Sequence, residues 1–243
     1  MKLRKQRPMR RGAGILLPVS SLPSPYGIGT FGREAYEFVD FLKAAGQKYW
    51  QVLPLGPTSY GDSPYQSFSA FAGNPYYIDL DRLIEKGLLT RRQVGSVDWG
   101  NAHEVDYGVL YQARFKLFRK AFQKSAHQEK AAYLQFCIEH EYWLNDYSTY
   151  MAVKSCFGGE EWIRWPENIR FRDPAAIEKI TGRLQAEIEF WKFCQYEFFT
   201  QWLELKAYAN KNGIEIIGDI PIYVALDSAD VWVYHRLFDL DEN

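Results

Sequence analysis

Three short apolar segments, with one very long helical stretch before the last, most constrain how this chain of 243 residues can fold. Residues 14–18, 49–53 and 215–224 are predicted strands because each is apolar and lies beside a glycine or proline that ends it. The first is apolar enough for a strand buried on both faces. The third changes character at Gly218, and Pro221 excludes a central strand beyond that point.

Residues 30–45 are predicted to form a helix between the first two strands. Thr30 is the predicted N-cap, and Gly46 stands where a C-terminal cap belongs. A strand, a helix and a strand in this order predict a right-handed parallel crossover. The helix face expected to be apolar consists of Phe31, Ala35, Phe38, Leu42 and Ala45.

The long stretch from residue 81 to residue 212 carries apolar residues at helical spacings. It predicts helices over residues 107–122, 129–157 and 174–211, with Asp173 as N-cap and Pro174 as first helical residue. The last helix ends at Asn212-Gly213. We expect five tryptophans to pack these helices together: Trp143, Trp162, Trp165, Trp191 and Trp202. The expected division is an α/β start (1–81), an inserted helical subdomain (82–213) and the third strand with its loop (214–243).

The loop after the second strand is the clearest candidate for a binding surface. Residues 54–75 alternate aromatic rings with hydroxyls, amides, glycines and one carboxylate, a mixture that suits the apolar faces and polar edges of a sugar. Glycines and prolines recur so densely that neither a helix nor a strand ladder is expected there. The alternative is that these rings fill a core beneath a long loop.

Asp219 is the second candidate, because it lies at the carboxyl end of the third predicted strand. Barrel enzymes place functional groups at the carboxyl ends of their parallel strands, and an unpaired carboxylate there would be costly. Asp227 and Ser228 are predicted to cap a short helix that runs through Trp232, and Asp230 is also interpreted as a capping residue.

Composition excludes several classes of protein. A net charge of −1 and an isoelectric point near 6.4 leave no basic surface for nucleic acid or for an anionic membrane. No window holds eighteen consecutive apolar residues, and the basic run from Lys2 to Arg11 lacks the apolar segment of a secretory signal. A soluble, cytoplasmic protein is therefore expected.

No metal or cofactor is expected either. Cys137, Cys156 and Cys194 are widely spaced, which favours buried thiols over a disulfide framework or a zinc site. The four histidines are equally scattered and show no metal-binding pair. Residues 27–32 match the glycine pattern of dinucleotide-binding proteins. However, they do not follow a strand directly, and no acid stands about twenty residues on.

Three long segments carry a resemblance to a known family. Residues 14–29, 49–81 and 216–232 resemble the N-terminal half of the amylomaltases, which are 4-α-glucanotransferases also called disproportionating enzymes. The resemblance extends over nearly the whole chain, and its motifs are long and almost ungapped.

The resemblance implies an α/β fold, the first part of a (β/α)8 TIM barrel with about three parallel strands and a large inserted helical subdomain. It implies the transfer of α-1,4-glucan segments between maltooligosaccharides, with glucose or maltose as acceptors, by a retaining double displacement. Ser63 and Tyr65 match positions on the donor side of the cleft, Asp219 matches the carboxylate after the third strand, and Tyr60 matches a surface glucan-binding position. Asp62 lies in the same loop and is a candidate to bind a sugar hydroxyl.

The chain departs from the family in its length. Family members are about twice as long, and the resemblance implies that their nucleophile and acid/base lie beyond Asn243, so no catalytic residue is expected in this chain. Three parallel strands cannot close an eight-stranded barrel, and the third would have an unpaired apolar edge. The hypothesis is a truncated or split protein that is inactive alone and is completed by a C-terminal half. The alternatives are a non-catalytic α-glucan-binding fragment and, less favoured, a hydrolase that uses Asp62 and Asp219.

Overall fold

The computed structural model describes residues 11–59, 61–101 and 103–240. Its sheet has three parallel strands in the order β1-β2-β3: β1 (Gly14–Leu16), β2 (Tyr49–Gln51) and β3 (Glu215–Ile217). In the register of these strands Trp50 lies between Ile15 and Ile216. The predicted strands and their parallel pairing are confirmed, although each strand is shorter than predicted.

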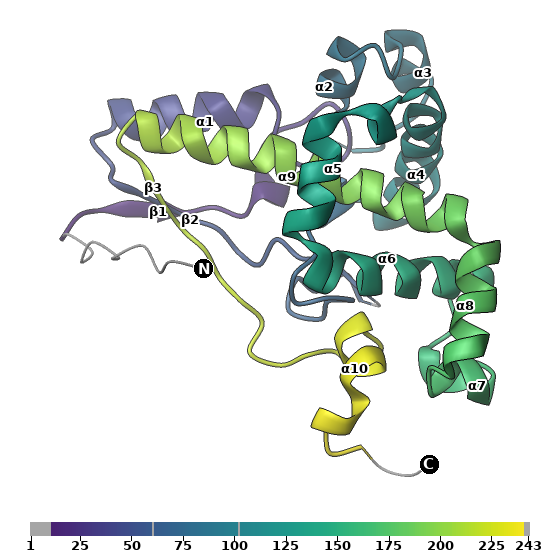
Figure 1. Ribbon diagram of the computed structural model, residues 1–243. Coiled ribbons are helices and arrows are strands. Elements are labelled where there is room, and N and C mark those ends of the chain that lie inside the picture. Colours follow the sequence, from purple (N-terminus) through teal and green to yellow (C-terminus); the bar gives the residue numbers. More distant parts are fainter. Residues whose placement is uncertain (1–10, 60, 102, 241–243) are drawn as a thin grey trace.

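The first strand is not buried on both faces, which corrects the sequence-based expectation. Leu16 is 53% exposed, whereas Trp50 in the central strand is fully buried. The reason is that Leu16 and its partner Gln51 lie on the face opposite Trp50, and the Trp50 face is the one that packs against Phe38 of the helix connecting β1 to β2. Helix α1 (Arg33–Ala44) connects β1 to β2, and α9 (Gln185–Lys211) precedes β3. Figure 1 shows both helices side by side along the strands, where they contact each other.

Helix α1 begins later than predicted. Gly32 is its N-cap, and the Thr30 hydroxyl instead donates to Oδ2 of Asp79 over 2.7 Å. A Cβ atom at position 32 would lie 2.2 Å from the same carboxylate oxygen, so this close approach requires glycine. At the other end Gly46 has a φ of +69° and its N–H donates to the Lys43 carbonyl, which confirms the predicted C-terminal cap. Ala45 lies outside the buried face and is exposed.

The remaining helices form a layer beside the sheet (Figure 1). Two predicted helices are each broken once, 129–157 at His140 and 174–211 at Leu184, because both residues leave helical geometry. The apolar pattern continues across both breaks, so spacing alone could not show them. The helices are α2 (Leu80–Glu85), α3 (Arg91–Gly95), α4 (Tyr107–Lys124), α5 (Ala131–Glu139), α6 (Glu141–Cys156), α7 (Glu167–Arg170), α8 (Pro174–Arg183) and α10 (Ala229–Tyr234). Short 3-10 turns occur at Val19–Ser21, Pro75–Tyr77, His127–Glu129, Trp162–Arg164 and His235–Leu237.

The predicted start of α8 is confirmed, since the Asp173 carboxylate accepts from the Ala176 N–H over 2.9 Å and Pro174 follows it. The end of α9 at Asn212-Gly213 is confirmed as well. Within the described ranges no helix has both the length and the apolar character needed to cross a membrane.

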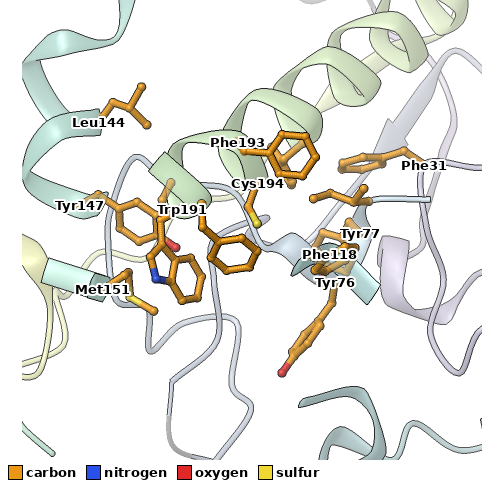
Figure 2. Packing of buried hydrophobic residues seen from close by; sticks show 14 of the residues in the cluster. Phe31, Tyr76, Tyr77, Phe118, Leu144, Tyr147, Met151, Trp191, Phe193 and Cys194 are labelled. Atoms are coloured by element: carbon orange, nitrogen blue, oxygen red, sulfur yellow. The ribbon is translucent and has the colours of Figure 1, made fainter. Parts of the chain in front are cut away.

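The core is densest where α9 packs on α6 and α4. Figure 2 shows Trp191, Phe193 and Cys194 of α9 against Leu144, Tyr147 and Met151 of α6, with Phe118 of α4 close by. Four of the five tryptophans predicted to pack helices are buried, and Trp202 is partly buried. Cys194 is buried and Cys137 half-buried, but Cys156 is exposed, which corrects the expectation of three buried thiols.

Candidate functional site

The loop after β2 and the segment after β3 meet at one pair of side chains. The Tyr65 hydroxyl donates to Oδ2 of Asp219 over 2.8 Å, and Oδ1 of Asp219 accepts from the Ile220 N–H over 2.8 Å. The hydrogen bond to this carboxylate raises the pKa of Tyr65. Because β2 and β3 are adjacent and parallel, their carboxyl ends lie at the same edge of the sheet. The fold thus brings together two of the residues singled out in the sequence.

Ser63 shapes the tip of this loop. Its Oγ accepts from the Tyr65 N–H over 3.3 Å, and its carbonyl accepts from the Gln66 N–H over 3.1 Å. A single isolated antiparallel bridge between Thr58 and Ser67 closes the tip, and it does not extend into a strand ladder. The tip is therefore a tight turn that holds Ser63 and Tyr65 next to each other, with Tyr65 47% exposed.

The base of the loop is fastened to α9 through two buried glutamines. The Gln195 side chain accepts from the Gly73 N–H over 2.8 Å and donates to the Gly73 carbonyl over 2.9 Å. Gln201 accepts from the Asp79 N–H over 2.7 Å. A Cβ atom at position 73 would lie 2.1 Å from the Phe198 ring, so the loop fits against the helix there only with glycine. These contacts fix the position of the chain where it leaves the loop.

The rings of this loop differ in burial. Phe68 is partly buried against the core, whereas Tyr65 is 47% exposed and Phe71 48% exposed. The core alternative therefore fits Phe68 in part and does not fit the other two. Residues 61–66 are exposed or half-buried and remain candidates for ligand contact.

Asp62 does not join the Tyr65–Asp219 pair. It has a φ of +56°, is exposed, and its electrostatic neighbours are Tyr76 and Tyr107. Partial removal from water raises the pKa of its carboxyl group.

Two positions that the sequence singled out lie outside the described residues. They are Tyr60, the predicted surface glucan contact, and Asn243, the residue beyond which the resemblance places the nucleophile and the acid/base. Both expectations therefore stay predictions.

Asp227 is not a helix cap. Ser228 caps α10 by accepting from the Val231 N–H over 3.2 Å. The Asp227 carboxylate instead forms an ion pair with Lys154 of α6, 2.6 Å from Nζ, and accepts from the Tyr150 hydroxyl. Burial and this carboxylate together raise the pKa of Tyr150. Sequence analysis missed this cluster because Asp227 is more than seventy residues from both of its partners.

Asp230 is not a cap either. Its Oδ2 accepts from the Ala70 N–H over 2.9 Å and so ties α10 to the loop after β2. Burial raises the pKa of this carboxyl group, while the bond from Ala70 opposes the shift.

A cavity of about 370 Å³ lies between this loop, α6 and α10. Its lining is mostly apolar and includes Phe71, Tyr142, Val224, Val233, Leu237 and Phe238. The sequence offered one signal for it, a cluster of apolar residues after Trp232 that no predicted element used. In the part of the chain that the structure describes, no group of three His, Cys, Asp or Glu side chains is placed to hold a metal ion.

Comparison with known proteins agrees with this architecture. The pattern of the 4-alpha-glucanotransferase family matches residues 17–243. A 4-alpha-glucanotransferase of Clostridium butyricum is 52% identical over 92% of this chain and 46% of its own length. The enzyme of that name from Thermus thermophilus is 49% identical over 96% of this chain and 46% of its own length. The chain spans about half the length of the curated relatives it matches.

Two solved structures are also similar. The amylomaltase from Streptococcus agalactiae in complex with acarbose superposes with a TM-score of 0.91 at 44% identity, over 96% of this chain and 48% of that one. The amylomaltase from Corynebacterium glutamicum, at 15% identity and a TM-score of 0.68, shares the fold over 91% of this chain and 32% of its own. The first likeness confirms the predicted fold class, a partial barrel of three parallel strands with helical insertions.

Proposed function

The chain belongs to the 4-alpha-glucanotransferase family, and from this premise we propose that it supplies the donor-side contacts of an enzyme that transfers α-1,4-glucan segments between maltooligosaccharides. The observation that carries the proposal is the Tyr65–Asp219 hydrogen bond at the carboxyl ends of two adjacent parallel strands. This is the edge of the sheet at which barrel enzymes bind their substrates. The acarbose in the Streptococcus agalactiae structure supports a carbohydrate ligand.

In this proposal Tyr65 offers its exposed ring to the apolar face of a glucose unit, while its hydroxyl stays on Asp219. The carboxylate retains acceptor capacity beyond its two bonds and would take a hydrogen bond from a sugar hydroxyl. Ser63 would supply a further polar group from the same turn. These groups orient the glucan and keep water away, which favours transfer to a sugar acceptor over hydrolysis.

The groups that break the glycosidic bond would come from another stretch of polypeptide. Glucose or maltose would act as the acceptor of the transferred segment. Retention at the anomeric carbon requires a carboxylate nucleophile and an acid/base about 5 Å apart. We do not assign this role to Asp62 and Asp219: Asp62 has Tyr76 and Tyr107 as electrostatic neighbours, while Asp219 accepts from Tyr65. Three free thiols also fit a reducing compartment, so we include a cytoplasmic location in the proposal.

The binding part of the proposal is tested by titrating the chain with maltoheptaose and following tryptophan fluorescence. The substitution Tyr65→Phe removes the hydroxyl that joins the loop to Asp219, and we expect binding to weaken roughly 2- to 10-fold, the value of one hydrogen bond. Tyr208→Phe is the matched control, because its hydroxyl donates to Asp40 over 2.7 Å between α9 and α1. Equal affinities for both variants would show that the hydrogen bond from Tyr65 to Asp219 does not support glucan binding.

The transfer part is tested with maltotriose. We expect glucose release when the chain is mixed with a polypeptide that supplies the remaining strands, and none from either piece alone. Turnover by the isolated chain would contradict the proposal. If that turnover produced new reducing ends and disappeared in Asp219→Asn, the hydrolase alternative would replace it. Binding without transfer in the mixture would favour a non-catalytic glucan-binding protein.

A further inference from the structure

The loop after β2 meets the chain after β3 at a second place besides the candidate pair. The Ala229 N–H at the start of α10 donates to the Phe68 carbonyl over 2.8 Å, and Asp230 accepts from the Ala70 N–H over 2.9 Å. These contacts lie beside α6, which α10 contacts (Figure 1). We call the place formed by these four residues the α10 joint.

Lys154 of α6 lies at the α10 joint and contacts both stretches of chain. Its Nζ is 2.6 Å from Oδ2 of Asp227, at the end of the segment after β3. The same Nζ lies 5.2 Å from the centre of the Phe68 ring, in the loop after β2, and a cation over an aromatic face is attracted to it. The Glu160 carbonyl accepts a further hydrogen bond from Nζ over 3.1 Å. One side chain of the helical layer therefore binds the loop and the segment together.

This lysine is too buried to bind a sugar itself. It is 8% exposed, and its Nζ is already engaged by Asp227 and by the Glu160 carbonyl. The Tyr65–Asp219 hydrogen bond, in contrast, involves a tyrosine that is 47% exposed, where water competes for both partners. A single exposed hydrogen bond contributes little net stability, so the spacing of the loop and the segment is set by the more buried contacts at the α10 joint.

Removal of the cation would release the segment after β3. Asp227 would be left with the Tyr150 hydroxyl and, at 3.4 Å, the Trp162 N–H as its donors. A partly buried carboxylate without its cation is costly, so Asp227 would turn toward water. Because Asp219 lies in the same segment between β3 and α10, that movement would draw it away from Tyr65.

We propose that Lys154 is a positioning residue for the candidate site: it fixes the loop after β2 and the segment after β3 relative to each other, and it thereby holds Tyr65 against Asp219. The inference rests on the proposed function, because this pair is the proposed glucan contact. It adds to that function a residue from α6 that does not touch the ligand and determines how well the pair is aligned to bind it.

The test makes the same substitution at two ion pairs. Lys154→Met removes the cation at the α10 joint. Lys86→Met is the matched control, because Lys86 forms an equally short pair with Glu197, at 2.6 Å, between the end of α2 and α9. Glu197 is 3% exposed, so the control should cost the fold at least as much. Asp227→Asn removes the other charge at the joint and decides the question if circular dichroism shows that Lys154→Met does not fold.

The first measurement needs no sugar. With isotope-labelled tyrosine, the NMR chemical shift of the Tyr65 Cζ atom at neutral pH reports whether the hydroxyl donates to a carboxylate. Tyr65→Phe identifies the resonance, and Asp219→Ala gives its position without the hydrogen bond. We expect Lys154→Met and Asp227→Asn to move the resonance toward that position and Lys86→Met to leave it unchanged. A resonance unchanged in the joint variants, or moved equally by the control, would overturn the inference.

The second measurement is the maltoheptaose affinity, followed by tryptophan fluorescence. We expect Lys154→Met to weaken binding roughly 2- to 10-fold, as for loss of the Tyr65 hydroxyl, but less than about twofold when Tyr65→Phe is already present. Lys86→Met should bind within about twofold of the unsubstituted chain. Equal weakening by Lys154→Met with and without the Tyr65 hydroxyl would show that Lys154 acts by another route, and would refute the inference.

The two measurements separate this inference from the proposed function. A Tyr65 resonance that moves in Lys154→Met, without maltoheptaose binding by any form of the chain, would count against the proposed function alone. Maltoheptaose binding that Lys154→Met leaves unchanged would count against this inference alone.

Discussion

The helix pair α6 and α9 and the segment of residues 218–227 between β3 and α10 both contain large apolar residues, but only the helix pair buries most of them. Phe193 in α9 is 1% exposed and has aromatic neighbours from α4 and from the turn before α5. Ile222, in the segment between β3 and α10, is 83% exposed. The comparison teaches that apolar character draws a residue out of water only where other elements supply a matching surface.

The two regions are joined by the ion pair between Lys154 of α6 and Asp227 at the end of the segment. Gln195 of α9 in turn binds the peptide of Gly73 in the loop after β2. The two helices therefore hold both the segment and the loop in place. Substitutions in the two regions should differ most in what they cost the fold.

The largest difference in unfolding free energy is expected between two substitutions that shorten a side chain to alanine. Phe193→Ala should lower the free energy of unfolding by about 3–5 kcal/mol, because it leaves a cavity among the rings of α4 and α9. Ile222→Ala should change it by less than about 0.5 kcal/mol, since little of that side chain is buried. Urea unfolding followed by circular dichroism measures both. Similar losses of unfolding free energy for both variants would show that the two regions do not differ in how much their apolar side chains stabilise the fold.

A smaller loss of unfolding free energy is expected where α9 binds the loop after β2. Gln195→Leu should cost about 2–3 kcal/mol, because the N–H and C=O of Gly73 would both lose their partner in a buried position. Gln135→Leu serves as the control: Gln135 is exposed on α5 and bonds to Glu139, so the same exchange should be nearly neutral there. If both variants unfold at the same urea concentration, Gln195 does not support the loop.

The next smaller loss of unfolding free energy is expected at the contact between the two regions. Lys154→Met removes the cation that faces Asp227 and should cost about 1–2 kcal/mol, less than a fully buried pair because Asp227 is 23% exposed. Hydrogen exchange should locate the loss in α10 and not in α9. Faster exchange spread evenly over both helices would show that Lys154 acts on the whole core.

The smallest effect concerns the pH dependence of stability. Burial raises the pKa of Asp230 above its ordinary value of 3.8, so the folded state binds this proton more tightly than the unfolded state. The contribution of Asp230 to stability is therefore fully present below pH 3.8 and is lost as the pH rises through the folded pKa. Asp230→Asn retains an acceptor for the Ala70 N–H and cannot ionise.

The stability of Asp230→Asn relative to the unsubstituted chain should accordingly increase as the pH is raised from about 3.5 to 6. Urea unfolding at several pH values in this range measures the difference. A difference that stays constant with pH would show that Asp230 has the same pKa in the folded and unfolded states.

Signals that act within a few residues predicted much of the fold. Gly46 ends α1 and Asp173 with Pro174 begins α8, as the sequence indicated. The same reasoning failed at Thr30 and Asp227, whose side chains bind partners from distant parts of the chain instead of the nearest helix. It also failed at the break in the middle of the predicted helix 129–157, where the apolar spacing continues through His140.

The candidate site shows the same limit. Asp219 and Tyr65 were chosen from the sequence as separate candidates, and the structure joins them by a hydrogen bond between residues 154 positions apart. Whether they bind a glucan stays a proposal, as does the division into residues 1–81, 82–213 and 214–243. The cavity beside α10 could not be predicted, because its walls come from the loop after β2, from α6 and from α10.

The sequence by itself determined the strands, their parallel crossover, the caps at Gly46 and Asp173 and the family, since each depends on residue type and order along the chain. Only the tertiary structure decided that Phe68 is partly buried while Tyr65 is exposed and meets Asp219, and that Asp227 binds Lys154. The physical reason is that burial and ion pairing are set by contacts between distant segments. Residues in the same local sequence pattern can therefore be buried or exposed, depending on what packs against them.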